Sequence, residues 1–282
     1  MAGDRKINTV LVTGASSGIG RSTSLYLAGK GYTVIATSRS RARLEGLLSE
    51  ANANGLAVHG VELDINVDDQ VDQVMRQVIS DHGTVDALVN NAGYGLWGPV
   101  GSLAIDELKA QFETNLFATV RMARAVLPGM LAQGAGKIVN VGSILGRMAT
   151  PFNGAYASSK FALEGLSESM RAELWPLGVH VAIVEPGVFE TDFMRNQVRA
   201  SASDDPELPY APYIQRYHTR HQRYHRLASD PVKVSKVIHK ILKSRRPSFR
   251  HPVGIEARLG MMAARFLPER LFQTMVSRAT MR

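Results

Sequence analysis

The stretch TGASSGIG, residues Thr13 to Gly20, places three glycines directly after the apolar run TVLV of residues 9–12. Glycine tolerates positive φ angles and lets a ligand approach the backbone closely. The segment that follows has helical periodicity, and a helix amino terminus offers free N–H groups and a positive dipole end to a phosphate. The stretch therefore predicts a strand-to-helix turn with a phosphate site. An ordinary tight turn is the alternative, because the spacing G-x-x-x-G-x-G differs from the common dinucleotide motif G-x-G-x-x-G.

Length and composition limit the possible classes of protein. The 282 residues can form one large α/β domain with a sizeable core. The net charge of +8 would suit an anionic ligand, a nucleic acid or an acidic membrane surface without choosing among them. Because the chain has no cysteine, disulfides, thiolate zinc sites and a cysteine nucleophile are excluded. The chain shows neither a secretory leader nor a spanning apolar run, so we expect a cytoplasmic protein.

Short β-branched runs alternate with longer segments of helical period, a pattern typical of βαβ units and a parallel sheet. The predicted strands cover residues 9–13, 32–37, 56–63, 85–90, 136–142 and 179–186, with a last strand near 249–253. The predicted helices cover residues 42–52, 68–83, 105–131 and 155–174. We therefore expect a single α/β domain over residues 1–254.

Residues 187–230 differ in composition from the alternating strand and helix segments before them. We interpret them as an insertion that covers a pocket as a lid. His218, His221 and His225 stand there at helical spacing, but no carboxylates accompany them, so we expect no metal. Tyrosine and arginine also occur together in this segment. Since no nucleic-acid motif accompanies them, we expect no nucleic-acid partner.

Residues 255–282 are predicted to form a C-terminal helical extension, in which Pro268 ends one helix and opens another. Leu259, Met262 and Phe266 give the first helix an apolar side, and arginines flank it. This composition also occurs in helices that lie on anionic membranes. We favour packing on the domain, as part of the pocket wall or on a neighbouring subunit, over a weak contact with a membrane surface.

The predicted strand at 32–37 is followed by the sequence SRSRAR. In dinucleotide folds an acidic residue about 20 positions after the glycine loop bonds the ribose 2′-hydroxyl, whereas an arginine accommodates a 2′-phosphate. Ser38 stands at the expected acidic position and Arg39 follows it, so no carboxylate would repel the phosphate. We predict NADP(H) rather than NAD(H) as the cofactor. A solvated, basic start of a helix is the alternative.

Candidate catalytic residues follow the strand at 136–142, whose carboxyl end should face the ligand. Ser143 stands at its tip, and Tyr156 and Lys160 lie one helical turn apart in YASSK. We expect the Lys160 ammonium to lower the pKa of Tyr156 and so make it a proton donor. Ser143 could polarise a substrate carbonyl. Without the glycine loop, such a tyrosine and lysine pair would more often be two exposed helix residues with no catalytic role.

Together these features resemble the short-chain dehydrogenase/reductase family from residue 9 to about Arg246. Its motifs are TGASSGIG, LDI at 63–65, NNAG at 90–93, Asn115, Ser143, YASSK, and PG at 186–187 with Thr191 beyond. The resemblance implies a Rossmann-type doubly wound parallel sheet with helices on both faces. It also implies a homodimer or homotetramer, and a catalytic tetrad of Asn115, Ser143, Tyr156 and Lys160, in which Asn115 holds a relay water. The expected cofactor-binding residues are Gly14, Ser16, Ser17, Gly18, Ile19, Gly20, Ser38, Arg39, Asp64, Ile65, Asn91, Ala92, Gly93, Tyr156, Lys160, Pro186, Gly187, Val188 and Thr191.

A closer resemblance, to the branch with 17-beta-hydroxysteroid dehydrogenase type 1 and photoreceptor-type retinol dehydrogenases, lies in PFNGAYASSKFALEGLSESMRAEL and EPGVFETDFM. It implies a lipophilic ketone or aldehyde, steroid- or retinoid-like, and its alcohol as substrates. The apolar residues expected on the substrate side are Leu96, Trp97, Leu145, Phe152, Phe189 and Phe193. Reduction of smaller carbonyls such as 3-oxoacyl groups, or a non-catalytic dinucleotide-binding regulatory role, are the alternatives.

Overall fold

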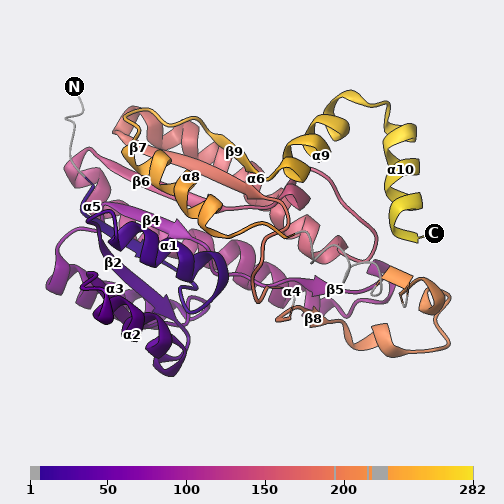
Figure 1. Ribbon diagram of the computed structural model, residues 1–282, viewed down its shortest axis with the longest axis horizontal. Coiled ribbons are helices and arrows are strands. Elements are labelled where there is room, and N and C mark those ends of the chain that lie inside the picture. The colour runs from indigo at the N-terminus through magenta and orange to yellow at the C-terminus, as the bar shows by residue number, and fades with distance from the viewer. Residues whose placement is uncertain (1–6, 194, 215, 218–227, 282) are drawn as a thin grey trace.

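A doubly wound parallel sheet forms the centre of the molecule (Figure 1). The computed structural model describes residues 7–193, 195–214, 216–217 and 228–281. Within them, seven parallel strands are ordered β3-β2-β1-β4-β6-β7-β9. The order reverses between β1 and β4, and open α/β sheets bind ligands at the carboxyl ends of the strands on either side of such a point. The predicted Rossmann-type sheet is confirmed.

The predicted strands are all present, within a few residues of their expected ends. The main sheet comprises β1 (Thr9–Val12), β2 (Thr33–Ser38), β3 (Val58–Glu62), β4 (Ala87–Asn90), β6 (Gly136–Val141), β7 (Val179–Pro186) and β9 (Arg250–Val253). The described α-helices are α1 (Gly18–Ala28), α2 (Glu45–Ala53), α3 (Asp68–His82), α4 (Ile105–Phe112), α5 (Ala118–Gln133), α6 (Gly154–Leu174), α8 (Val232–Lys243), α9 (Ile255–Phe266) and α10 (Glu269–Met281).

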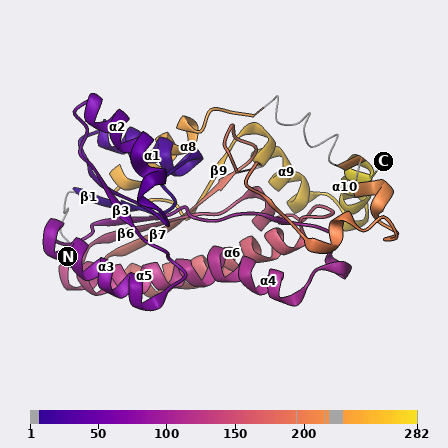
Figure 2. The same ribbon diagram turned by 90° about the horizontal axis from the view of Figure 1, so that it is seen from below.

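Helices cover both faces of the sheet. Figure 2 shows α1, α2 and α8 on one face and α3, α5 and α6 on the other. Successive residues of a strand point to opposite faces, so Val10 and Val12 pack with Leu27 of α1 in one core cluster. Leu11 packs with Met122 of α5 in the other. Burial on both faces explains why central strands such as β1 and β4 are continuous apolar runs rather than alternating ones.

Two local features are missing from the sequence prediction. The short strands β5 (Leu96–Trp97) and β8 (Val198–Arg199) pair in parallel outside the main sheet, and two residues are too few to show a pattern. The helix predicted for residues 105–131 exists, but a π-helical turn at Glu113–Phe117 separates α4 from α5. Such turns frequently occur at functional sites, and this one carries Asn115.

The tail forms the two predicted helices, α9 and α10, beyond the carboxyl ends of the strands and away from the N terminus (Figures 1 and 2). For α9, the expected packing of the large apolar residues on this domain is wrong, and their packing on a neighbouring subunit stays a prediction. Leu259, Met262 and Phe266 are between 57% and 72% exposed. The reason is that α9 meets the domain with small residues. Ala257 is fully buried, and a Cβ on Gly260 would lie 2.8 Å from Ile144 Cδ1.

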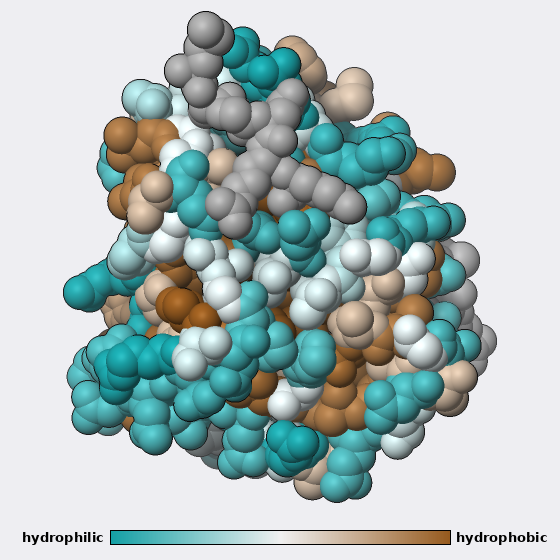
Figure 3. Space-filling model, turned by 90° about the vertical axis from the view of Figure 1, so that its left-hand side faces the viewer, coloured by the Kyte–Doolittle hydropathy of each residue, from teal (hydrophilic) through white to brown (hydrophobic). Residues whose placement is uncertain are grey.

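The end of the molecule opposite the tail has a mixed surface. Figure 3 shows hydrophilic residues over much of this face, interrupted by small apolar patches. Within the part of the chain that is described, no helix is both long and apolar enough to cross a bilayer.

Candidate active site

A cavity of about 1010 Å³ lies at the carboxyl ends of the strands. It extends from the end of β2, past the glycine loop, to α6 and the segment after β7. Most residues predicted to bind the cofactor line it: Gly14, Ser16, Ser17, Gly18, Ile19, Ser38, Arg39, Asp64, Ile65, Asn91, Ala92, Gly93, Tyr156, Lys160, Pro186, Gly187, Val188 and Thr191. Gly20 and Asn115 stand behind the wall. The cavity therefore brings together the predicted phosphate-binding residues near the glycine loop and the predicted catalytic residues Tyr156 and Lys160, which lie more than 100 positions later in the sequence.

The glycine loop is packed too closely for side chains. Gly14 has φ +65°, and a Cβ there would lie 2.8 Å from Ala92 Cα. A Cβ on Gly20 would lie 2.3 Å from the Gly14 carbonyl oxygen, so Gly20 serves packing rather than ligand contact. Ser17 makes no side-chain capping bond to α1, which leaves the N–H groups of the first turn without a cap at the cavity wall. This arrangement fits a bound pyrophosphate.

The basic residues after β2 separate into two roles. Arg41 is turned toward β3, where its Nη1 donates to the Gly60 carbonyl at 3.2 Å and its backbone N–H donates to Glu62 at 2.9 Å. Arg39 and Arg43 instead line the cavity beside Ser38. The end of the cavity at β2 therefore presents a hydroxyl and two guanidinium groups, a donor set that suits a phosphate.

Asn91 connects β1 to β4 at the switch point. Its Nδ2 donates to the carbonyl oxygens of Thr13, at 2.9 Å, and Gly14, at 3.2 Å. The Thr13 hydroxyl in turn accepts the backbone N–H groups of Asn91 and Ala92. The Asn91 side chain thus holds the glycine loop against the next strand while it lines the cavity.

Tyr156 and Ser143 meet at the inner end of the cavity. Ser143 follows β6, and its Oγ accepts the Leu145 backbone N–H at 3.1 Å. Tyr156, on α6, is hydrogen-bonded to Ser143 and is 7% exposed. Burial raises the pKa of Tyr156 to about 12, and the bond to Ser143 opposes this only in part. The phenol is therefore protonated at neutral pH, contrary to the expectation that Lys160 lowers its pKa.

The ammonium of Lys160 lies near the Tyr156 ring but hydrogen-bonds a backbone carbonyl. Its Nζ donates to the Val141 carbonyl at 2.8 Å and is 5.8 Å from the centroid of the Tyr156 ring. Burial lowers the pKa of Lys160 to about 8, and the carboxylate of Glu164 partly opposes this. The ammonium faces the Tyr156 ring and bonds the Val141 carbonyl rather than the phenol hydroxyl, which explains why Lys160 does not lower the pKa of Tyr156.

Asn115 holds the turn after β4 rather than lining the cavity. Its Nδ2 donates to the Tyr94 carbonyl at 3.0 Å and to Ser159 Oγ at 3.1 Å, and its Oδ1 accepts the Tyr94 N–H at 3.1 Å. A Cβ on Gly93 would lie 2.9 Å from Asn115 Oδ1 and 4.0 Å from Lys160 Nζ. The π-helical turn therefore brings this amide close behind the lysine, and its part in a water relay stays a prediction.

Three of the residues expected to face substrate do not line the cavity, and this is a correction. Trp97 and Phe152 pack with Tyr217 in an aromatic cluster, with ring centroids 5.5 to 5.9 Å apart. Leu96 packs in a neighbouring cluster with Ala155. All three side chains are buried in these clusters.

The remaining expected substrate residues, Leu145, Phe189 and Phe193, do line the cavity. The Phe193 ring lies 5.4 Å from the Tyr156 ring, centroid to centroid. An apolar side chain from the segment after β7 thus borders the phenol. A substrate that reaches Tyr156 would contact an apolar surface there.

A family model described as short chain dehydrogenase matches residues 8–202. The chain belongs to the short-chain dehydrogenase family. A 3-ketodihydrosphingosine reductase of Bacteroides thetaiotaomicron is 36% identical, covering 87% of each chain. Human retinol dehydrogenase 8 is 36% identical, covering 88% of this chain and 81% of its own. Human 17-beta-hydroxysteroid dehydrogenase type 1 is 35% identical, covering 86% and 76%. The resemblance to the steroid and retinol branch is confirmed.

Solved structures agree with this membership. A short-chain dehydrogenase from Streptomyces avermitilis superposes with a TM-score of 0.82 at 31% identity, covering 98% of this chain and 99% of its own. A metagenomic short-chain oxidoreductase in complex with NADP superposes with a TM-score of 0.69 at 27% identity, covering 89% and 97%. The protein is thus an oxidoreductase of this family with a site for a nicotinamide dinucleotide.

This short-chain dehydrogenase has wall residues that sequence reasoning missed. Val188 donates its backbone N–H to Glu256 of α9 at 3.0 Å, and Asn153 donates to the Tyr217 hydroxyl. Ala279 of α10 also lines the cavity, so both tail helices reach it. The apolar pattern of the tail could have indicated Ala279, whereas Glu256 gave no signal in the sequence.

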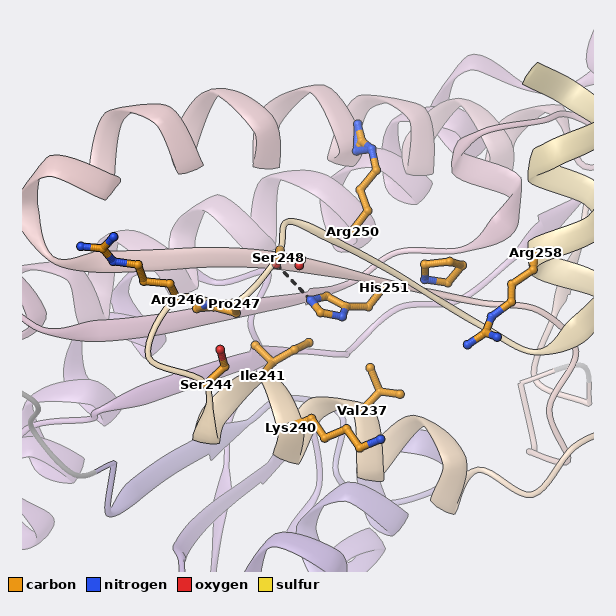
Figure 4. Close-up of a pocket in the computed structure, with 11 residues that line it drawn as sticks. Val237, Lys240, Ile241, Ser244, Arg246, Pro247, Ser248, Arg250, His251 and Arg258 are labelled. Atoms are coloured by element: carbon orange, nitrogen blue, oxygen red, sulfur yellow. Dashed lines mark hydrogen bonds between the residues drawn. The ribbon is translucent and has the colours of Figure 1, made fainter. Parts of the chain in front are cut away.

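A second cavity, of about 510 Å³, lies between α8, the segment 244–252 and α9 (Figure 4). Its lining includes Lys240 and Arg258, but none of the predicted site residues.

The histidines considered as metal ligands, His218, His221 and His225, lie outside the described residues. Among the residues that are described, no cluster of histidine and acidic side chains has the size of a metal site.

Proposed function

We propose that the protein is an NADP(H)-dependent reductase and dehydrogenase that interconverts a lipophilic ketone or aldehyde and its alcohol. The observation that carries the proposal is the hydrogen-bonded pair of Ser143 and Tyr156 above Lys160, at one end of a cavity whose other end presents Arg39 and Arg43. The acid and the polarising hydroxyl needed for carbonyl chemistry thus share a cavity with a phosphate-binding donor set.

Each residue of the site would perform one step. The Ser143 hydroxyl bonds the carbonyl oxygen of the substrate, and Tyr156, protonated at neutral pH, donates its proton to that oxygen. Lys160 binds the nicotinamide ribose and returns positive charge to the region of the phenolate that forms. Val188 and Thr191 hold the carboxamide side. The bound dinucleotide supplies the hydride in reduction and accepts it in oxidation.

The choice of NADP(H) is supported by the residues at the end of β2. Ser38 has no carboxylate to repel a 2′-phosphate, and Arg39 is exposed and at the cavity wall. Arg43 adds a second cation from the start of the next helical segment. The same rule for acidic and basic residues after the second strand separates NAD from NADP sites in dinucleotide folds.

A lipophilic substrate is supported by the wall around Tyr156. Leu145, Phe189 and Phe193 line it, and the relatives named above are a sphingoid ketone reductase, a retinol dehydrogenase and a hydroxysteroid dehydrogenase. A ketoacyl reductase of Nostoc, 34% identical over 69% of this chain, keeps the smaller 3-oxoacyl group as the second candidate.

We propose that residues 187–230 act as a lid on the domain of residues 1–254.

The deciding experiment measures NADPH oxidation with a steroid ketone, retinal, a long-chain 3-ketosphingoid base and a short 3-oxoacyl thioester. The proposal expects kcat/KM to be highest for one of the first three, with NADPH preferred over NADH. A preference for the short thioester would transfer the assignment to the second candidate. Binding of NADPH without turnover on any of the four would support the regulatory alternative.

We also propose that the outer side of α9 contacts an anionic membrane surface. Leu259, Met262 and Phe266 form an exposed apolar stripe, and Arg258 and Arg265 are exposed on the same helix. A helix with an apolar side and a cationic side can lie in the headgroup region.

The expected homodimer or homotetramer stays a prediction, which the mass of the protein in solution tests.

A further inference from the structure

A buried carboxyl pair lies behind the lysine of the site. Tyr156, Lys160 and Glu164 follow one another at four-residue intervals on α6 and therefore share one face of the helix. Glu164 is 4% exposed and Glu185, on β7, is fully buried. Glu185 directly precedes Pro186 and Gly187, which line the cavity, so the pair borders both the lysine and the segment after β7.

The two carboxyl groups face each other, and a cation from the neighbouring strand β9 bonds one of them. Arg250 of β9 donates from Nη1 to Glu164 at 2.9 Å and from Nη2 to Glu168 at 3.1 Å. In Figure 4, Arg250, which also lines the cavity there, extends its side chain away from α8. Glu164 and Glu185 are within hydrogen-bonding reach of each other, and among the described residues no other donor reaches Glu164 Oε1 or either oxygen of Glu185.

Two facing carboxylates with no donor between them are unstable in a buried site. A buried acceptor that lacks a hydrogen bond costs free energy, and two like charges at contact distance do not both ionise. One proton between the two groups resolves both problems, because the protonated carboxyl donates to the other. The pair then carries a single negative charge, which Arg250 balances.

We propose that Glu164 and Glu185 share one proton, which resides on Glu185, and that the charge left on Glu164 acts on Lys160 as a positioning group that keeps its ammonium protonated. The proposal rests on the role assigned to Lys160 in the proposed function. Without a negative charge one turn away, a lysine this deeply buried would more readily lose its proton and its hold on the ribose.

The surrounding charges agree with this distribution. Burial raises the pKa of both carboxyl groups, and repulsion by Glu164 raises that of Glu185 further. Arg250 and Arg147 oppose the rise at both, and Glu168 adds to it at Glu164. For Lys160, the only charged group with a resolved effect among the described residues is Glu164, which raises its pKa against the effect of burial.

Isosteric variants separate the charge from the packing. In Glu164→Gln the charge beside Lys160 is lost, so we expect the fall of kcat/KM on the alkaline side to move to lower pH by about one unit. In Glu185→Gln the amide donates to a Glu164 carboxylate that stays charged, so the profile should keep its wild-type position. Glu168→Gln, on the same helix and bonded to the same arginine, is the matched control and should also leave the profile in place. Equal shifts in Glu164→Gln and Glu185→Gln would overturn the proposal, and so would no shift in either.

A second readout needs no turnover and so separates this proposal from the proposed function. Infrared spectra of the protein at neutral pH should contain the carbonyl band of a buried protonated carboxyl group, which disappears in Glu185→Gln and persists in Glu168→Gln. Absence of that band from the wild type overturns the shared proton, whatever the substrate. Presence of the band in a protein that reduces no carbonyl would uphold the pair and reject the assigned chemistry.

Discussion

Lys160 Nζ lies 5.8 Å from the centroid of the Tyr156 ring, one helical turn away on α6, and donates to the Val141 carbonyl. Both side chains are buried, so each disfavours its charged form. The phenol is held as an acid and the ammonium is close to losing its proton. This division fits carbonyl reduction, in which the tyrosine must begin protonated.

Replacing Tyr156 by phenylalanine should remove turnover and leave NADPH binding intact. A general acid contributes about 100- to 10,000-fold to rate, and no other phenol is bonded to Ser143 among the described residues. Steady-state kinetics and fluorescence titration of NADPH measure the two effects. Tyr94→Phe removes another phenol from the same cavity and should retain most of kcat. If Tyr156→Phe retained wild-type kcat, the acid would have to be another group.

Arg39→Ala should weaken NADPH binding much more than NADH binding. A charge-assisted hydrogen bond contributes about 1.5–3 kcal/mol, or roughly 10- to 100-fold in Kd. Ser38→Asp combined with Arg39→Ala should reverse the preference, because the new carboxylate repels a phosphate and accepts from a hydroxyl. Arg41→Ala is the control, since Arg41 is engaged by β3. Equal losses for both cofactors in Arg39→Ala would exclude a contact with the 2′-phosphate.

The pKa of Lys160 sets a pH dependence of both activity and stability. The kcat/KM for reduction should fall as pH rises through about 8, where the free enzyme loses the ammonium. The unfolded chain, with a lysine pKa of 10.5, binds more protons between about pH 8 and 10.5, so folding becomes more favourable across this window as pH rises. The wild type should therefore gain about 3 kcal/mol relative to Lys160→Met between the two limits. Urea unfolding at both ends measures this gain, and a constant difference would contradict it.

The sequence predicts the sheet well because its central strands are buried on both faces and form apolar runs, whereas the edge strands β3 and β9 are partly exposed. The carboxyl ends of those strands then bring Ser38, Ser143 and Pro186 to one edge, which is why the site could be located. The pairing of the two-residue strands β5 and β8 was not predicted. Neither Leu96 nor Val198 gives a pattern of its own, and the packing of Trp97 against Phe152 and Tyr217 depends on residues far apart in the sequence.

Electrostatic properties of the site were predicted less well than its composition. The spacing of Tyr156 and Lys160 correctly places them on one face of α6, but the orientation of the ammonium toward Val141 is a property of packing. The small residues of α9 are a similar case. Ala257 and Gly260 look unremarkable in the sequence, yet they decide which side of the helix meets the domain.

Shortening the tail in two steps should separate substrate binding from cofactor binding. Ending the chain after Leu267 removes α10 and with it Ala279, so KM for bulky apolar substrates should rise while the Kd of NADPH stays constant. Ending it after Gly254 also removes Glu256, which accepts the Val188 N–H, so NADPH binding should weaken as well. Circular dichroism checks that both proteins fold. An unchanged KM after the first truncation would show that α10 does not contribute to the substrate site.

The full chain should sediment with liposomes that contain acidic lipids and remain in solution with neutral ones. The reason is the outward side of α9, where Leu259 and Phe266 are exposed on the same helix as the exposed Arg265. Added salt should reduce binding, because screening weakens the attraction between arginine and the lipid headgroups. Leu259→Ser with Phe266→Ser should abolish it without changing NADPH affinity, whereas Leu271→Ser, on α10, tests whether the second helix takes part. Sedimentation that is unaffected by the double variant would reject α9 as the contact. If the wild type stays in solution and the double variant lowers its oligomeric mass, the stripe packs against a second copy of the chain instead.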